Sequence, residues 1–222
     1  MAAESNLRRL VGRAAAALLF FLPAAQAQTD DPAVRCVACH GPQGQSTQPQ
    51  IPSLAAQPRI FLENQLVLIR EGLREVPPMQ GLLDGLSDAD LVALAKYFAA
   101  QPPRPAAVSD DPARYASGQA LAGRRRCASC HLPQFQGRDQ MPRLAGQNEP
   151  FLRTTLQEYR DRPGPGRDTA MSAVLYGLSD AQLDALAHFM SHFPSPAAEP
   201  ALQSTPDEGQ PATRPVPPRT AP

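Results

Sequence analysis

The sequence predicts an all-α protein built from two similar small domains in tandem, each made of a few helices. Three observations lead to this prediction. A set of landmarks recurs about 90 residues further along the chain, both copies carry apolar residues at helical spacing, and no segment shows the alternation of a β-strand. The length of 222 residues accommodates one or two domains.

The first 27 residues have the pattern of a secretory signal peptide. Three arginines near the start precede an apolar run over residues 14–22, and the small residues of Ala25-Gln26-Ala27 are typical of a cleavage site. The alternative is an uncleaved membrane anchor, but the apolar run is shorter than the roughly 20 residues that a spanning helix needs. We therefore predict residues 1–27 to be a signal peptide, removed on export, so that the mature chain starts at Gln28.

The charge of the chain argues against nucleic acid as a partner. The chain carries 21 basic and 21 acidic residues, and removal of residues 1–27 leaves 18 basic and 20 acidic ones, a net charge of −2. A nucleic-acid-binding protein needs a basic footprint, which this balance does not supply. No later stretch is apolar enough to cross a bilayer, so we expect no stable membrane span in the mature chain.

The repeat is anchored by a Cys-x-x-Cys-His motif that occurs twice. Cys36-Val-Ala-Cys39-His40 recurs 91 residues later as Cys127-Ala-Ser-Cys130-His131. Further landmarks follow both motifs in the same order, displaced by 90 to 92 residues: Ile51–Gln57 and Met141–Gln147, Phe61-Leu62 and Phe151-Leu152, Arg70 and Arg160, Met79 and Met171, Leu86-Ser87-Asp88 and Leu178-Ser179-Asp180. The small slips belong in loops, so this order indicates a tandem duplication.

The repeat and the proline distribution divide the mature chain into four parts. We expect a first domain over residues 28–101, a stiff Pro-rich linker over residues 102–111 and a second domain over residues 112–193. The remaining residues, 194–222, hold many prolines and few large apolar side chains, so we predict a disordered tail.

Each copy shows two clear helices after its motif. Residues 59–71 and 149–161 form one matching pair. The second pair starts at capping boxes, with Ser87 three residues before Asp90 and Ser179 three residues before Gln182. The apolar stripes behind these caps are Leu91, Leu94, Ala95 and Phe98 in the first copy, and Leu183, Leu186, Ala187 and Met190 in the second.

The two copies differ in the segment that precedes the motif. Only residues 28–35 precede Cys36 in the mature chain, whereas the second copy has a lead-in over residues 112–126 in which Gly118 and Leu121 suit helix packing. We therefore expect the first domain to lack most of an N-terminal helix that the second domain has.

Cys-x-x-Cys-His is the attachment signature of a c-type haem. The two thiols, three residues apart on one helical turn, form thioether bonds to the macrocycle, and the adjacent imidazole ligates the iron. The cysteine pairs are too far apart for a zinc ribbon, no βαβ context supports a thioredoxin-like redox pair, and structural disulfides would not explain the histidines. We predict two covalently attached c-type haems, bound by Cys36, Cys39, Cys127 and Cys130, with His40 and His131 on the two irons.

The sixth ligand of each iron is predicted to be a methionine. Met79 and Met171 lie at matched distances of 40 and 41 residues after the second cysteine of their motifs, in the loop before each last helix. The alternative is that both are core residues, as methionines often are. Met141 lies too close to its motif to reach the far side of a haem, and Met190 sits on the apolar stripe, so we read both as packing residues.

Two further histidines follow the second motif. His188 aligns with Lys96 of the first copy, so we expect it on an exposed helix face, and neither it nor His192 is expected to ligate iron.

With these motifs, the chain resembles the dihaem cytochrome c4 family, whose members consist of two class I cytochrome c domains. The resemblance covers residues 36–193 and includes both haem motifs, both candidate methionines and both Leu-Ser-Asp helix starts. It implies two all-α domains, each wrapped around a covalent haem, with the haems close enough for electron exchange. It also implies a periplasmic electron carrier that serves redox proteins such as a haem-copper oxidase or a dehydrogenase.

Two features stand out against this resemblance. Leu132-Pro133 follows the second haem histidine where Gly41 follows the first, which is expected to alter the second haem edge. The run Arg124-Arg125-Arg126 precedes Cys127, either as a solvated helix end or as a patch for propionates or an acidic partner.

Three functions are compatible with the sequence. The first is a free periplasmic carrier of single electrons, which is not an enzyme and has no catalytic residue. The second is the cytochrome subunit of a dehydrogenase whose catalytic centre lies on another chain. The third, a dihaem peroxidase, needs an iron with an open face, which two methionine ligands would close.

Overall fold

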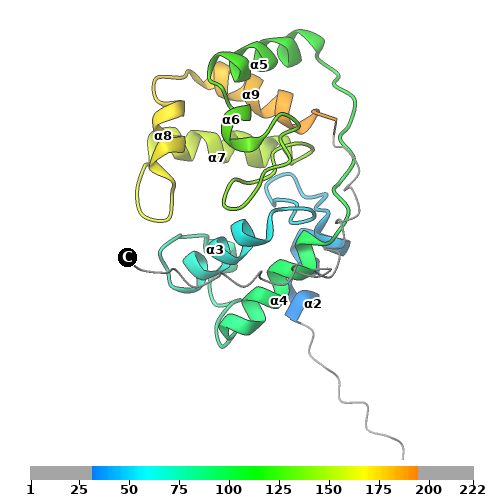
Figure 1. Cartoon of the computed structure of the whole chain (residues 1–222), viewed down its shortest axis with the longest axis vertical. Helices are drawn as coiled ribbons and strands as arrows, with labels where there is room; N and C mark the ends of the chain where they lie inside the picture. Colours follow the sequence, from blue (N-terminus) through cyan, green and yellow to red (C-terminus); the bar gives the residue numbers. More distant parts are fainter. Residues whose placement is uncertain (1–31, 195–222) are drawn as a thin grey trace, which may run out of the picture. The chain divides into compact units, whose positions relative to one another are not determined.

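The computed structural model describes residues 32–194, which belong to one compact unit (Figure 1). The predicted signal peptide and, from residue 195 on, the predicted tail lie outside the described residues. Residues 32–194 form helices without any strand, apart from one isolated bridge between Arg138 and Met141. The prediction of an all-α fold is confirmed.

The first repeat contains three α-helices and two short 3₁₀ helices. In chain order these are α2 (Pro32–His40), η1 (Pro42–Gly44), α3 (Arg59–Arg70), η2 (Pro77–Met79) and α4 (Asp88–Ala99). The predicted apolar stripe of α4 is buried and packs against α2 and α3 in one cluster, which consists of Ala33, Leu62, Leu91, Leu94, Ala95 and Phe98. The motif helix α2 is therefore held to the rest of the repeat by apolar contacts.

The second repeat follows the same plan with a longer entry. Its helices are α5 (Pro112–Arg124), α6 (Ala128–His131), α7 (Glu149–Asp161), α8 (Thr169–Leu175) and α9 (Asp180–Ser191). The expected helices at residues 59–71 and 149–161 are confirmed as α3 and α7. Its core is larger and includes Leu121, Phe135, Leu152, Leu175, Leu183, Leu186, Phe189 and Met190.

The last helix of each repeat starts as predicted. Ser87 and Ser179 accept hydrogen bonds from the third residue of α4 and α9, and the capping box is complete in both. The repeated arginines Arg70 and Arg160 add a second link, since each donates to the carbonyl of the leucine before the cap, at 3.1 and 2.8 Å. The duplicated residues thus perform the same structural task twice.

Helices α5 and α9 pack closely because of one glycine (Figure 1). A Cβ atom on Gly118 would lie 2.0 Å from the carbonyl oxygen of Ala185 and 2.6 Å from Cβ of Phe189. Only glycine allows the two backbones to approach this far. Leu121, one turn later, is buried in the same core, as its position in the sequence suggested.

Residues 101–111, between α4 and α5, contain no helix but are held at several points. Arg104 donates to the carbonyl of Ser46 and to the side chain of Asn148, and Gln45 donates to the carbonyl of Pro102. The segment therefore contacts both repeats along its course.

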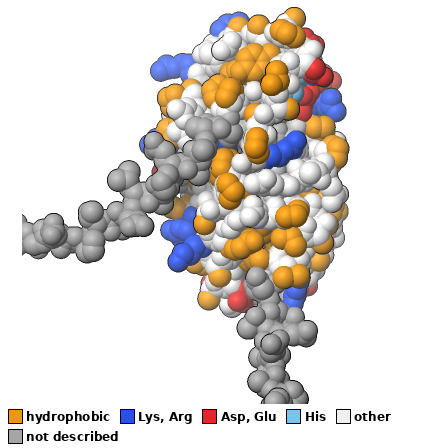
Figure 2. Space-filling view, turned by 90° about the vertical axis from the view of Figure 1, so that its right-hand side faces the viewer, with side chains coloured by type: hydrophobic (Ala, Val, Ile, Leu, Met, Phe, Trp, Pro, Cys, Tyr) orange, Lys and Arg blue, Asp and Glu red, His pale blue; other side chains and the backbone are white. Residues whose placement is uncertain are grey.

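Charged side chains on the face drawn in Figure 2 stand in separate groups among hydrophobic and uncharged ones. Basic side chains do not form a continuous stripe on that face, in keeping with the balanced composition. Among residues 32–194, no helix has the length and apolar character needed to cross a membrane.

Candidate haem sites

Each Cys-x-x-Cys-His motif lies on a helix. Cys36 and Cys39 lie within α2 and His40 is its last residue, whereas Cys127 is the N-cap of α6 and Cys130 lies within that helix. The second cysteine of each pair is exposed, whereas Cys36 and Cys127 are partly buried. Because residues three apart share a helix face, both thiols of a pair are presented on one side. Burial raises the pKa of the Cys127 thiol.

The two motif histidines are buried and held in the same way. His40 and His131 are 7% and 6% exposed, and the Nδ1–H of each donates to a proline carbonyl, Pro52 at 2.8 Å and Pro142 at 2.9 Å. Since a carbonyl can only accept, this bond holds the tautomer whose Nε2 lone pair can bind a metal. Burial lowers the pKa of both rings more than the bond to the proline carbonyl raises it. Both the burial and the Nδ1 bond to a carbonyl therefore favour an imidazole whose Nε2 is available for ligation.

The two candidate methionines lie in short helices rather than in the predicted loops. Met79 is the last residue of η2, and Met171 lies in α8, where its amide donates to the N-cap side chain of Asp168 at 2.9 Å. Both are partly buried. Met171 packs, together with Cys127, against the core of the second repeat. Prolines 77 and 78 form the start of η2 and stiffen the approach to Met79.

Two glutamines link the repeats in matching pairs of hydrogen bonds. Gln147 accepts from the amide of Ser53 at 2.7 Å and donates to its carbonyl at 2.9 Å. Gln57 accepts from the amide of Arg143 at 2.9 Å and donates to its carbonyl at 3.0 Å. The two glutamines are equivalent in the repeat, and so are Ser53 and Arg143, so the pairing has approximate two-fold symmetry.

Arg143 carries a buried guanidinium that fits a carboxylate. The side chain is 7% exposed, and Nε and Nη2 have no hydrogen-bond partner among the described residues. Burial lowers the pKa of this guanidinium. Arg143 and Arg104 line the same small cavity between the glutamine pairs, together with small and amide side chains. An arginine fork favours carboxylates, and a haem carries two propionates, so the residues at this position fit the predicted cofactor.

The arginine run before the second motif is exposed. Arg124 ends α5, and Arg125 and Arg126 lie in the turn before Cys127. The carbonyl of Arg126 accepts from Ser129 Oγ at 2.8 Å. Both interpretations of these three arginines, a solvated helix end or a patch for propionates or an acidic partner, require exposed side chains.

The expectation that His188 is exposed is wrong. Its side chain is 0% exposed. It extends from α9 and contacts Arg114 of α5 and Glu149 of α7. Nδ1 lies 2.9 Å from a carboxylate oxygen of Glu149 and 2.7 Å from Arg114, and Nε2 lies 2.8 Å from Ser109 Oγ. The equivalent Lys96 of the first repeat is exposed, so the difference comes from the segment that covers α9.

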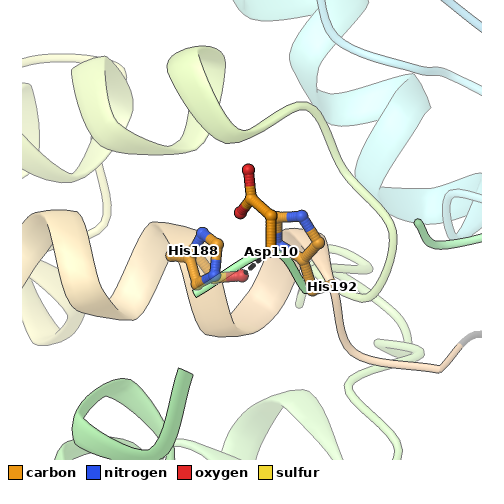
Figure 3. A group of neighbouring side chains, drawn as sticks. All are labelled: Asp110, His188 and His192. Carbon is orange, nitrogen blue, oxygen red and sulfur yellow. Dashed lines mark hydrogen bonds between the residues drawn. The ribbon is translucent and has the colours of Figure 1, made fainter. Parts of the chain in front are cut away.

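Figure 3 shows the side chains of Asp110, His188 and His192 side by side. One potential metal-ligating atom of each lies within 4.8 Å of those of the other two. The centroids of the His188 and His192 rings lie 4.2 Å apart. Both nitrogens of His188 are already engaged, and the Arg114 guanidinium that touches the ring disfavours a cation. We read the group as a structural hydrogen-bond cluster.

Sequence reasoning missed the carbonyls of Pro52 and Pro142 and the role of the two glutamines. The glutamines were visible as a repeated position, but their partners are main-chain atoms of the other repeat, which no side-chain pattern encodes. The sequence marked Arg143 only as a member of the repeated segment Met141–Gln147. Its burial depends on the tertiary structure.

Family models match both repeats. Residues 115–194 match the model for cytochrome c, and residues 29–98 match the model for subunit III of cbb3-type cytochrome c oxidase. The two matches include the two Cys-x-x-Cys-His motifs, one in each.

Whole-length relatives have both repeats in one chain. Cytochrome c4 of Azotobacter vinelandii is 32% identical over 173 residues, which cover 70% of this chain and 82% of the relative. The thiosulfate dehydrogenase electron acceptor of Thiomonas intermedia is 30% identical over 201 residues, covering 85% of this chain and 92% of the relative. The crystal structure of reduced recombinant cytochrome c4 from Pseudomonas stutzeri matches with a TM-score of 0.67 and 31% identity, over 73% of this chain and 96% of that one.

Proposed function

Because the chain belongs to the cytochrome c4 family, dihaem electron carriers with two covalent c-type haems, we propose that it passes single electrons between redox partners in the periplasm at two His/Met-ligated irons. Its relatives of this type are carriers, not enzymes.

Covalent attachment uses the cysteine pairs. Cys36 and Cys39 bind the first haem through thioether bonds, and Cys127 and Cys130 bind the second. Support comes from the helical position of each pair, which places both thiols on one side.

His40 and His131 bind the irons through Nε2. The observation that carries this proposal is the hydrogen bond from each Nδ1 to a proline carbonyl, which fixes the ring orientation and leaves Nε2 as the donor atom. Met79 and Met171 would each supply the second protein ligand to the iron of their repeat. A thioether ligand raises the reduction potential relative to a second histidine and closes the iron to other ligands.

When bound, each haem accepts and returns one electron without a bond to a substrate. The chain's own residues would hold each iron through a buried histidine, His40 or His131, and a methionine, and they place a buried guanidinium, Arg143, beside the seam between the repeats. With both faces of the iron closed, outer-sphere transfer is the reaction that remains.

The test is an optical spectrum of the matured, oxidised protein with haem counted per chain. We expect two haems and the weak near-infrared band of sulfur-to-iron ligation. Met79→Leu and Met171→Leu should each remove about half of this band. Met141→Leu is the matched control and should leave it unchanged. A wild-type protein with a high-spin component that binds cyanide would contradict the ligation by two methionines.

A second candidate function is that of electron acceptor for a dehydrogenase on another chain. The observation that favours it is the relative named thiosulfate dehydrogenase electron acceptor, aligned over 85% of this chain. In this role the donor is oxidised and each of the two haems takes up one electron. Co-purification with a redox enzyme, and reduction of the chain by that enzyme with its substrate, would support this function over that of a free carrier feeding a haem-copper oxidase.

Periplasmic location rests on the family and on the predicted signal peptide. Cytochromes c4 are periplasmic in general. The predicted cleavage after Ala27 lies outside the described residues, and N-terminal sequencing of the exported protein tests it directly, with Gln28 as the expected first residue.

A further inference from the structure

We propose that Gln147 and Gln57 are positioning residues for the haem histidines of the opposite repeat, and that each acts through a single peptide group. Docking of the two repeats then sets the electron donation of both histidines. The proposal rests on the proposed binding of iron by His40 and His131.

The first relay runs through the peptide group that joins Pro52 and Ser53. The carbonyl of this group accepts from Nδ1 of His40 at 2.8 Å, and its N–H donates to Oε1 of Gln147 at 2.7 Å. One rigid peptide plane therefore connects the histidine of the first repeat to a side chain of the second. The two bonds lie on opposite sides of the same amide.

The second relay has the same form with the repeats exchanged. The peptide group that joins Pro142 and Arg143 accepts from Nδ1 of His131 at 2.9 Å, and its N–H donates to Oε1 of Gln57 at 2.9 Å. Each glutamine also donates to the carbonyl of the residue whose amide it accepts from. These second bonds hold each side-chain amide against the backbone of the opposite repeat at a second point.

Both relays are shielded from water. Ser53, Gln57 and Gln147 are each 5% exposed, and Arg143 is 7% exposed. In such surroundings hydrogen bonds are electrostatically stronger, and bonds in series polarise one another. Among residues 32–194, the glutamine oxygens accept one further hydrogen bond, from the neighbouring amide of Asn148 to Oε1 of Gln147 at 3.0 Å.

The direction of the effect follows from the order of the bonds. A glutamine oxygen that accepts from the peptide N–H makes the carbonyl of that peptide more negative. This carbonyl then draws the Nδ1 proton more strongly, which makes the imidazole a better electron donor. Stronger donation favours ferric over ferrous iron, so each relay lowers the reduction potential at the histidine that it serves. Separation of the repeats would raise both potentials.

The experiment measures both reduction potentials in the full-length, haem-loaded protein, assigned to each haem by NMR during a redox titration. Gln147→Leu should raise the potential at the His40 site and leave the His131 site nearly unchanged. The expected size is about a threefold change in the one-electron equilibrium, roughly 30 mV. Gln57→Leu should show the converse. Leucine is used because it adds no new ligand for iron.

Asn64→Ala is the matched control. Its side-chain amide donates to Gln140 of the other repeat at 3.3 Å, but it touches neither relay peptide. If the glutamines only hold the repeats together, Gln147→Leu will shift both potentials alike or neither, and either result overturns the proposal. An equal shift in Asn64→Ala overturns it as well.

A second readout is the exchange of the His40 Nδ1 proton with solvent in the reduced protein. We expect faster exchange in Gln147→Leu, because the acceptor carbonyl is weakened. If that variant fails to bind two haems, Gln147→Glu provides the test, since it keeps an acceptor oxygen for the Ser53 amide and should keep the exchange slow. Fast exchange in Gln147→Glu contradicts the relay. A wild-type protein without His/Met spectra would instead contradict the proposed function.

Discussion

Leu132 adopts the backbone conformation that Gly41 adopts in the first repeat, with φ 68° and ψ 161° against φ 76° and ψ 168°. Both residues directly follow a motif histidine. This region of backbone space is open to glycine and costs about 1–3 kcal/mol for other residues. The departure noted in the sequence, leucine in place of glycine, is therefore a site of backbone strain beside His131.

Replacement of Leu132 by glycine should relieve this strain. We expect Leu132→Gly to raise the free energy of unfolding by about 1–2 kcal/mol, measured by denaturant titration of the haem-loaded protein. Gly41→Ala is the opposite control, because a Cβ there would lie 2.5 Å from the carbonyl oxygen of Gln45. It should lower the stability. No gain in Leu132→Gly would show that the leucine side chain offsets the strain through packing.

The contact between α5 and α9 should not tolerate a methyl group. Gly118→Ala would place Cβ 2.0 Å from the Ala185 carbonyl oxygen, and we expect a loss of about 3 kcal/mol from overpacking. Gly123→Ala, in the same helix with nothing within 4 Å of the added atom, should instead stabilise by up to about 1 kcal/mol. Thermal unfolding of the two variants compares them directly, and equal effects would contradict the close approach.

The carboxylate of Asp184 should contribute to stability only above acidic pH. Burial raises its pKa, but hydrogen bonds and charge from Arg114 and Arg153 outweigh this, so the folded-state pKa is lowered. The contribution is therefore present above the unfolded-state value of about 3.9 and is lost as the pH falls through the lower folded-state pKa.

The variant Asp184→Asn isolates this contribution. Urea unfolding at several pH values should show the variant to be less stable than the wild type at neutral pH, by up to about 1 kcal/mol because the pair is partly exposed. The difference should shrink below about pH 4. A difference that is the same at pH 3 and pH 7 would contradict the role of this charge.

Loss of the buried imidazole of His188 should destabilise the second repeat. His188→Ala removes one hydrogen-bond partner from Ser109 and one from Glu149 and leaves a cavity in the core, and we expect a loss of about 2–4 kcal/mol in denaturant unfolding. His192→Ala, at a side chain that retains 14% exposure, should lose less. His188→Gln should recover part of the loss through its side-chain hydrogen bonds, whereas equal losses in all three variants would argue against these bonds.

Local features of the fold were predictable because their signals are local. The capping boxes at Ser87 and Ser179 appear in the structure at the predicted residues, and α3 and α7 span the predicted segments to within one residue. Helix caps and apolar periodicity involve neighbours within a turn or two, so the sequence contains both partners of each interaction.

His188 shows where this reasoning ends. Its position on the last helix matches that of the exposed Lys96, so the repeat alone predicts exposure. The polar and charged partners that surround it are Ser109, Arg114 and Glu149, which lie 79, 74 and 39 residues away in the sequence. Such partners are chosen by packing, which a repeat pattern does not specify.

The sequence by itself determined the tandem repeat, the helical class and the two haem motifs, because each rests on residue types at short, fixed spacing. Only the tertiary structure decided that Gln147 and Gln57 bond to the peptide groups that hold the opposite histidines. Those bonds join residues 94 and 86 positions apart. Their acceptors and donors include main-chain atoms, which every residue possesses, so only the docking of the two repeats selects which of them meet.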